Sequence, residues 1–253
     1  MIKGMAQQLK WQLGTVVEIR EETPTAKSLI LDLLDWTTHV AGQHVDVRLT
    51  AEDGYQAQRS YSIASPPGDK HLMLTVERLD DGEVSPYLTD GLGVGDRIEL
   101  RGPIGGYFVW DPRNLGTNGH PLFLAAGGSG IAPLMSMIRH RASTGNKVPT
   151  RILYSSRSYE EVIYREELDR LSAHDPTLRV IHTLTRRRPP NWMGYGRRID
   201  RAMLADTAWR PEEKPLAFTC GPTAFVETVA THLGELGYEP GRIKTERFGP
   251  TGG

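Results

Sequence analysis

The stretch from residue 122 to 133, L-F-L-A-A-G-G-S-G-I-A-P, decides how the second half of this chain folds. It begins with an apolar run of strand length, passes through three glycines around a serine, and leads into apolar residues spaced for one helix face. Glycines at such a turn allow a close approach to the backbone, and N–H groups at a helix start attract phosphate. Because the motif is neither a complete G-x-G-x-x-G nor a P-loop with its lysine, a tight turn that binds nothing is equally compatible with it.

Apolar runs alternate with helical patterns throughout this half of the chain. Strands are predicted at 121–126, 151–156, 178–185, 215–220 and 243–248, and helices at 131–142, 160–171 and 223–237. Such alternation predicts an α/β domain with a doubly wound parallel sheet. In these sheets ligands bind at the carboxyl ends of the strands, near the switch point, and the glycine turn follows the first predicted strand.

The first half of the chain has a different pattern. Short strands are predicted at 13–20, 28–33 and 44–49, with turn signals such as E-D-G, P-P-G-D and D-D-G between the strand-like runs. Several short strands at this spacing favour an antiparallel β-barrel or sandwich. The turn-rich stretch 111–121, D-P-R-N-L-G-T-N-G-H-P, indicates a boundary. We therefore predict two domains, at 9–112 and 119–253.

The composition excludes several classes of protein. The 253 residues include 30 basic and 31 acidic side chains, without the basic excess of a nucleic-acid binder. No signal peptide is evident, and no apolar run approaches the roughly 20 residues that cross a bilayer. Cys220 is the only cysteine, too few for a disulfide or an iron–sulfur cluster, and the histidines lack metal-ligand spacing. We expect a cytoplasmic protein without a metal site, nucleic-acid partner or membrane contact.

Five motifs occur in an order that is typical of one enzyme family. They are Q-R-S-Y-S at 58–62, D-G-E-V-S-P-Y-L at 81–88, G-D-R-I-E-L-R-G-P-I-G-G-Y-F at 95–108, the glycine turn, and T-C-G-P-T at 219–223. With these motifs the chain resembles the ferredoxin–NADP reductase superfamily over nearly its whole length. The resemblance implies a flavin-binding barrel followed by a pyridine-nucleotide domain, an NAD(P)H oxidoreductase activity, and FAD as the flavin.

The resemblance also implies which residues bind the flavin. Arg59 offers a fork of donors for a phosphate, Tyr61 a ring and hydroxyl for the ribityl chain, and Ser62 a hydroxyl beside flavin N5. Gly82 and Ser85 match a turn that opens a helix at the pyrophosphate. The predicted flavin site comprises Arg59, Ser60, Tyr61, Ser62, Val76, Arg78, Gly82, Val84 and Ser85. Each has an ordinary structural interpretation as well, such as a solvated arginine, a core tyrosine or a helix start.

The resemblance implies a nicotinamide dinucleotide as the second cofactor. In the family its pyrophosphate lies against the glycine turn, which implies contacts with Gly128, Ser129 and Gly130. Arg157 and Arg186 follow the second and third parallel strands, where an arginine suits the 2′-phosphate of NADP and an acid would suit NAD. NADP is therefore predicted, with NAD possible. The run R-R-R at 186–188 also fits a solvated loop or a patch that docks an acidic partner.

The reaction centre is implied by the last two motifs. The family places Cys220, with Gly221 and Pro222, against the nicotinamide ring, where the cysteine shapes the site and is not a nucleophile. Glu246 lies near the reacting atoms, and Phe248 is a candidate to cover the flavin ring, although five residues follow it here. Ser62, Cys220 and Glu246 are thus the predicted catalytic residues.

Hydride transfer from NADPH to FAD requires no catalytic triad, because the cofactors supply the chemistry. With a single cysteine and no fused ferredoxin domain recognised, the sequence predicts a reductase that passes electrons to a separate ferredoxin, flavodoxin or oxygenase component. Two alternatives stay open: an NAD(P)H:flavin or quinone reductase with a small diffusible acceptor, and a non-enzymatic flavin-binding subunit that only relays electrons.

Overall fold

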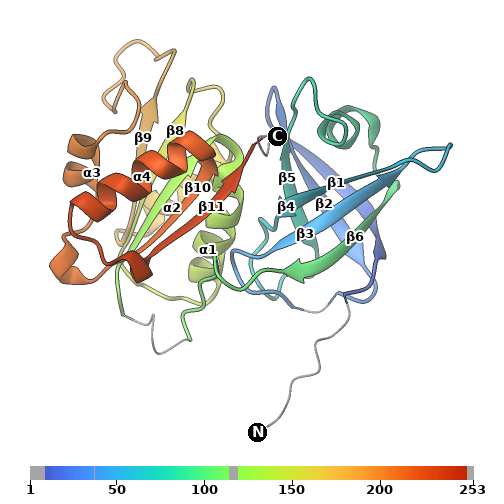
Figure 1. Ribbon diagram of the computed structural model, residues 1–253, viewed down its shortest axis with the longest axis horizontal. Coiled ribbons are helices and arrows are strands. Elements are labelled where there is room, and N and C mark those ends of the chain that lie inside the picture. The colour runs from blue at the N-terminus through green and yellow to red at the C-terminus, as the bar shows by residue number, and fades with distance from the viewer. Residues whose placement is uncertain (1–8, 37, 114–118, 250–253) are drawn as a thin grey trace, which may run out of the picture.

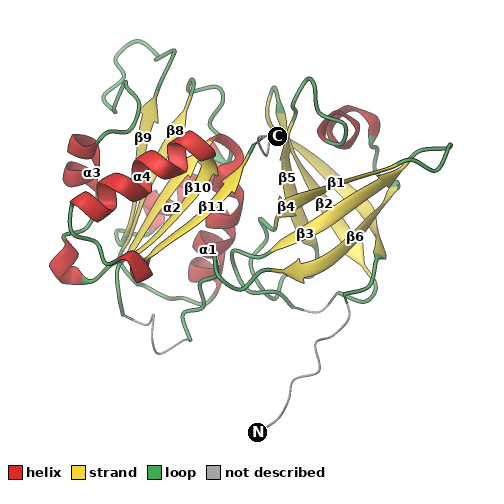
Figure 2. Ribbon diagram, viewed as in Figure 1, coloured by secondary structure: helices red, strands yellow, loops and turns green. Residues whose placement is uncertain are grey.

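The computed structural model describes residues 9–36, 38–113 and 119–249. Two domains lie side by side, an all-β domain and a domain in which helices flank a parallel sheet (Figures 1 and 2). The predicted boundary at 111–121 and the residues after Phe248 lie partly outside the described residues. Among the described helices, none has the length and apolar character needed to cross a bilayer.

The first domain is a six-stranded antiparallel sheet in the spatial order β4-β3-β6-β1-β2-β5. Its strands are β1 (Gln12–Thr23), β2 (Ala26–Leu33), β3 (His44–Thr50), β4 (Gln56–Ser62), β5 (Leu72–Glu77) and β6 (Arg97–Ile104). Just beyond β4, Ile63 bridges Leu74, and the Ala64 N–H donates to the Met73 carbonyl at 2.8 Å. This contact joins the two edge strands and closes the sheet, so the predicted antiparallel barrel is confirmed. A single helical turn, Tyr87–Gly91, follows the second motif.

Strand β5 forms the seam between the two domains. Alternate residues fill the barrel core: Leu72, Leu74 and Val76. Because side chains alternate across a strand, Met73, Thr75 and Glu77 point toward the second domain. The Thr75 hydroxyl hydrogen-bonds to Tyr164, and the Glu77 carboxylate accepts the Ser129 N–H at 3.3 Å. The second domain therefore rests on one face of a strand whose other face belongs to the barrel core.

The second domain contains a parallel sheet in the order β11-β10-β7-β8-β9. The strands are β7 (Leu122–Gly127), β8 (Thr150–Ser156), β9 (Leu178–Leu184), β10 (Leu216–Pro222) and β11 (Ile243–Phe248). The chain starts in the middle, adds β8 and β9 on one side, and then crosses to β10 on the other. The order reverses between β7 and β10, so the glycine turn lies at the switch point, as doubly wound sheets predict.

Helices cover both faces of this sheet. Apolar residues of α1 (Ile131–Ser143) and α2 (Arg165–His174) belong to one core with the strands, while those of α3 (Arg201–Thr207) and α4 (Thr223–Glu235) belong to another. In Figure 1, α4 crosses in front of the strands. Single helical turns occur at Gly128–Gly130, Pro211–Glu213 and Pro240–Arg242. The core that contains α1 also includes Phe108 and Trp110, which follow β6 of the barrel. This core therefore extends across the seam between the domains.

The predicted strands are confirmed, but one helix boundary is wrong. The helix predicted at 160–171 begins only at Arg165, because Tyr164 directly before it has φ 59°, in the left-handed region. The short helix α3 was not predicted, since its seven residues follow an arginine- and glycine-rich loop. A local cap begins α3, because the Asp200 side chain accepts the Met203 N–H at 2.7 Å. Tertiary contacts hold Tyr164, as described below.

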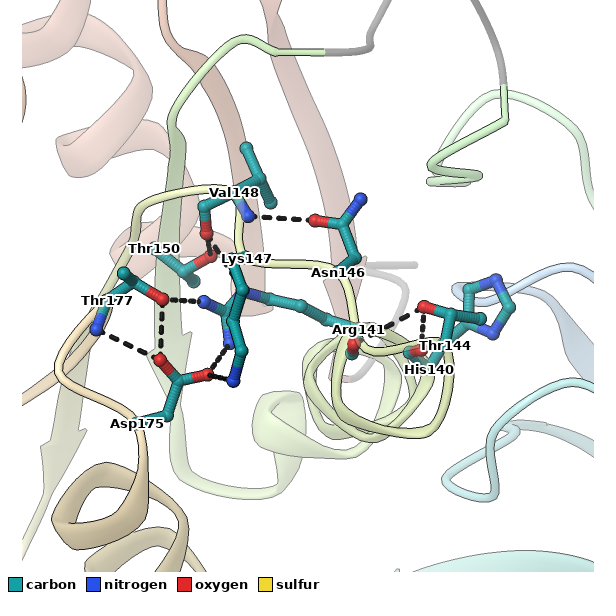
Figure 3. Close-up of polar contacts among 9 residues, drawn as sticks. All are labelled: His140, Arg141, Thr144, Asn146, Lys147, Val148, Thr150, Asp175 and Thr177. Carbon is teal, nitrogen blue, oxygen red and sulfur yellow. Dashed lines mark hydrogen bonds and ion pairs between the residues drawn. The ribbon is translucent and has the colours of Figure 1, made fainter.

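A buried arginine fixes the C-terminal end of α1 (Figure 3). The guanidinium of Arg141 binds the Asp175 carboxylate at 2.8 Å, donates to the Val148 carbonyl at 2.9 Å, and donates to the Thr177 hydroxyl. Its side chain is only 2% exposed. These contacts join the end of α1 to the segments that precede β8 and β9.

Candidate active site

The glycine turn packs directly against the end of β10. Gly128 has φ +55°, a left-handed conformation that an L side chain rarely adopts. Gly130 has an ordinary conformation, but a Cβ there would lie 2.2 Å from the Cys220 carbonyl oxygen. Hence the first position needs glycine for its backbone angle, and the third needs glycine for close packing.

A carboxylate already faces the backbone of this turn. Glu77, at the end of β5, accepts the Ser129 N–H through Oε2 at 3.3 Å. An acceptor that approaches from β5 can therefore reach the N–H at this helix start, where phosphates commonly bind. Sequence reasoning missed Glu77, although the alternation of L-M-L-T-V-E places it on the face of β5 opposite to Val76.

The three predicted catalytic residues come together at the domain interface. The Ser62 hydroxyl, at the end of β4, donates to Glu246 Oε1 of β11 at 3.2 Å. Cys220 of β10 is paired in register with Glu246 and is 2% exposed. Residues from three separate strands, one in the barrel and two in the parallel sheet, therefore converge beside the glycine turn.

Burial controls the protonation of this cluster. Desolvation raises the pKa of Glu246 to about 7, against a smaller opposing effect of the Ser62 hydrogen bond. Burial also raises the pKa of the Cys220 thiol, and the nearby Glu246 carboxylate raises it further. The thiol is therefore neutral at physiological pH, which agrees with a shaping role, whereas Glu246 exchanges a proton near neutrality.

We expect Glu246→Gln to change how stability depends on pH. The folded state binds the Glu246 proton more tightly than the unfolded chain, whose ordinary value is 4.5. This contribution is complete below about pH 4.5 and is lost as the pH rises through about 7, so the variant should gain about 3 kcal/mol relative to the parent across that window. Thermal unfolding of the flavin-free protein between pH 4.5 and 8 measures it.

The matched control is Glu52→Gln, which changes an exposed glutamate in the loop between β3 and β4. Its stability difference from the parent should be the same at every pH. A difference for Glu246→Gln that is also constant between pH 4.5 and 8 would contradict the raised pKa.

Arg59, which is predicted to bind the flavin pyrophosphate, forms an ion pair in the structure. Arg59 Nη2 lies 2.7 Å from Glu83 Oε2, and Tyr55 donates to the same carboxylate at 2.8 Å. Glu83 lies inside the Gly82–Ser85 turn, which closes through a hydrogen bond from the Leu79 N–H to Ser85 Oγ at 3.0 Å. Arg59 and this turn are therefore adjacent through Glu83, a partner that sequence reasoning missed, while their binding of the flavin stays a prediction.

The other predicted flavin residues divide into core and surface positions. Val76 and Val84 are buried, at 0% and 1% exposure, and belong to the barrel core. Burial raises the pKa of Tyr61 to about 12, and its ring packs against the barrel core. Arg78 pairs with Asp80 and Asp90, at 2.7 and 2.8 Å. Ser60 donates to Asp46 at 2.7 Å.

Arg157 and Arg186, which are predicted to bind the 2′-phosphate, lie next to each other. The Arg157 carbonyl accepts the backbone N–H of Arg186 at 2.8 Å and that of Arg187 at 3.1 Å. Both side chains are exposed, and within the described part of the chain neither forms a salt bridge. The loops after β8 and β9 thus present two cations together at the carboxyl edge of the sheet.

The remaining predicted residues lie along β10 and β11. A Cβ at Gly221 would meet the Gly127 backbone at 3.2 Å, so the ends of β7 and β10 are in contact. Pro222 is paired in register with Phe248, the last residue of β11, whose side chain is 37% exposed. Phe248 is therefore near the cluster and accessible, and its proposed stacking on the flavin stays a prediction.

Two known families match the two domains. The family described as oxidoreductase FAD-binding domain matches residues 8–109, and that described as oxidoreductase NAD-binding domain matches residues 124–231. This chain belongs to the ferredoxin–NADP reductase superfamily. Its two domains are thus an FAD-binding and an NAD-binding domain of the oxidoreductase type.

Individual members of the superfamily align over most of the chain. The ferredoxin–NAD(P)+ reductase component of the naphthalene 1,2-dioxygenase/salicylate 5-hydroxylase systems of Ralstonia sp. is 29% identical over 246 residues, 94% of this chain and 69% of its own length. The glycine betaine monooxygenase reductase subunit of Chromohalobacter salexigens is 32% identical over 215 residues. That alignment covers 83% of this chain and 56% of the relative. The chain thus spans only part of these relatives.

Among solved structures, the Amycolatopsis cytochrome P450 reductase superposes with a TM-score of 0.82 and 27% identity, over 96% of this chain and 71% of that one.

The residues described above fit both cofactors of the superfamily. The glycine turn directs the Ser129 N–H toward the Glu77 side chain, so an acceptor can reach it, and Gly130 leaves no room for a side chain beside Cys220. Arg59, beside the Gly82–Ser85 turn, supplies the exposed cation that a flavin pyrophosphate requires.

Proposed function

We propose that this reductase takes a hydride from NADPH onto bound FAD and passes the electrons to a separate ferredoxin, flavodoxin or oxygenase component. The observation that carries the proposal is the hydrogen bond between Ser62 and Glu246, 3.2 Å long, beside Cys220. This bond joins the end of β4 in the barrel to the edge strand β11 of the second domain. A flavin ring bound by the first domain and a nicotinamide ring bound by the second would therefore meet here.

FAD, when bound, accepts the hydride and releases electrons to the acceptor. The residues of the chain orient the two cofactors. Arg59 exchanges its ion pair with Glu83 for the flavin pyrophosphate, and Ser62 hydrogen-bonds the ring edge. Cys220 presents a neutral, buried thiol against the nicotinamide, which excludes water from the contact. Glu246 holds a proton at its carboxyl oxygen near neutral pH and keeps Ser62 in orientation.

The dinucleotide is proposed to lie across the switch point. The Ser129 N–H, which donates to Glu77 in the structure, would hold its pyrophosphate, and Arg157 and Arg186 would hold its 2′-phosphate. The exposed side chains of these arginines and the link between their backbones support NADPH over NADH.

The acceptor is proposed from the relatives and from the cysteine count. The two aligned relatives are named as reductase components of a dioxygenase system and of a monooxygenase. The 253 residues contain one cysteine, so they cannot ligate an iron–sulfur cluster themselves. Electrons that leave FAD one at a time therefore pass to a centre outside these residues.

The deciding experiment is an absorbance spectrum of the purified protein, recorded without oxygen before and after addition of NADPH, and repeated with NADH. A flavin spectrum that NADPH bleaches supports the proposed donor side. Reduction of added ferredoxins or flavodoxins then tests the acceptor side. Bleaching followed by electron transfer only to free flavin or quinone would favour a small acceptor, and flavin that neither nucleotide bleaches would leave only a relay subunit.

Arg157→Ala should discriminate between the two donors. Loss of a charge-assisted contact to the 2′-phosphate should raise KM for NADPH by about 10- to 100-fold and leave KM for NADH unchanged. Steady-state reduction of an artificial acceptor with each nucleotide measures the effect. Arg170→Ala, an exposed arginine on α2 in the same domain, is the control and should change neither KM. Equal losses with both nucleotides would remove the 2′-phosphate assignment.

A further inference from the structure

A chain of hydroxyl groups crosses the seam between the two domains. The Ser28 hydroxyl donates to Glu22 Oε1 at 2.6 Å and lies 2.7 Å from the Thr75 hydroxyl. The Thr75 hydroxyl in turn hydrogen-bonds to the Tyr164 hydroxyl. Glu22, Ser28 and Thr75 come from β1, β2 and β5 of the barrel, whereas Tyr164 belongs to the second domain.

The terminal carboxylate fixes the direction of every bond in this chain. A carboxylate only accepts hydrogen bonds, so the proton of Ser28 is used by Glu22. The Ser28 oxygen therefore accepts from Thr75, and the Thr75 oxygen accepts from Tyr164. The Thr75 oxygen therefore needs a donor from the second domain, and the Tyr164 hydroxyl supplies it. A phenylalanine at position 164 would leave the Thr75 oxygen without this donor.

The second domain holds Tyr164 in a conformation that a tyrosine rarely adopts. Its φ is 59°, and its side chain is buried at 3% exposure. Such a backbone persists only when surrounding contacts enforce it. The Arg139 guanidinium lies 4.6 Å from the centre of the Tyr164 ring, bonds to Glu167 at 2.6 Å, and donates to the Ala64 carbonyl of the barrel at 2.7 Å.

Strand β5, which carries Thr75, also reaches the glycine turn. Thr75 and Glu77 are on the same face of β5, two residues apart, and each contacts a different part of the second domain. A shift of the domain at Thr75 would therefore change the gap between β5 and the glycine turn, and with it the contact of Ser62 with Glu246. Hydride transfer is sensitive to such a shift, because the reacting atoms must approach to about 3–3.5 Å.

Resting on the function proposed above, we propose that Tyr164 is a positioning residue for the hydride transfer. Its hydroxyl fixes the nucleotide domain on β5 and so sets how closely the two rings approach. It touches neither cofactor and acts through Thr75.

The test compares Tyr164→Phe, Thr75→Val and the double variant with the parent. Tyr238→Phe is the matched control, because Tyr238 is also buried in the second domain, at 4% exposure, but its hydroxyl donates within that domain to the Trp209 carbonyl at 2.8 Å. The first readout is the unfolding midpoint of the flavin-free proteins in urea. The second is the single-turnover rate of flavin reduction by NADPH in the FAD-loaded proteins, with the isotope effect for deuterium at nicotinamide C4.

We expect Tyr164→Phe and Thr75→Val each to slow flavin reduction about tenfold, with a larger isotope effect and unchanged FAD affinity. The double variant should be no slower and no less stable than the worse single variant, because both changes break the same bond. Tyr238→Phe should lower the unfolding midpoint and leave the rate unchanged. A parent-like rate for folded, FAD-loaded Tyr164→Phe, or losses that multiply in the double variant, would overturn the proposal.

Discussion

Gly130→Ala is expected to lower kcat/KM for NADPH by about a hundredfold or more, although it adds only one methyl group. The new Cβ would lie 2.2 Å from the Cys220 carbonyl oxygen, 2.5 Å from its carbonyl carbon and 2.8 Å from the Gly221 nitrogen. All three are backbone atoms of a central strand, which cannot rotate away as a flexible side chain does. The turn and the end of β10 must separate, and a displacement of about 1 Å at a reaction centre costs about that factor in rate.

Stability should fall as well, by about 1–3 kcal/mol, because overpacking in a dense interior forces backbone shifts. Flavin reduction by NADPH and thermal unfolding of the same preparation measure both effects. The control is Gly234→Ala in α4, where no atom lies within 4 Å of the added Cβ, so alanine should be neutral or slightly stabilising in the helix. If Gly130→Ala kept parent-like activity and stability, the close packing of the turn on β10 would be disproved.

Arg141→Met should give the largest loss of stability in the second domain, about 3–5 kcal/mol. The methionine keeps most of the apolar stem but removes the guanidinium that binds Asp175, and it leaves the carboxylate without its buried partner. Desolvation alone would raise the pKa of Asp175, yet hydrogen bonds from Thr177, Arg141 and Lys147 hold that pKa well below its ordinary value. These contacts, drawn in Figure 3, therefore stabilise the charged form.

Urea unfolding measures the effect of Arg141→Met on the free energy of unfolding. Lys147→Met is the matched control, because Lys147 lies 3.1 Å from the same carboxylate but its side chain is 65% exposed, and exposed ion pairs contribute about 0–1 kcal/mol. Equal, small losses in the two variants would show that the buried arginine is not the main anchor of α1.

The sequence alone determined the fold of each domain and the position of the glycine turn between strand and helix. Apolar periodicity is a local property, so the change from short alternating strands to strand–helix alternation separated the barrel from the parallel sheet. The motif order supplied the superfamily and named Ser62, Cys220 and Glu246 as neighbours. The structure brings these three residues together, while their roles in the reaction stay predictions.

Only the tertiary structure decided which groups meet across the domain seam. Ser62 and Glu246 are 184 positions apart, and Thr75 and Tyr164 are 89 positions apart. The sequence analysis assigned no role to Glu77 or Glu83, and it placed Tyr164 inside the helix predicted at 160–171. Their partners depend on how β5 packs against the second domain and how Arg59 meets the neighbouring turn. Periodicity shows which face of a strand is buried, but a contact between distant residues exists only once the domains have docked, because docking fixes the distance and direction between their side chains.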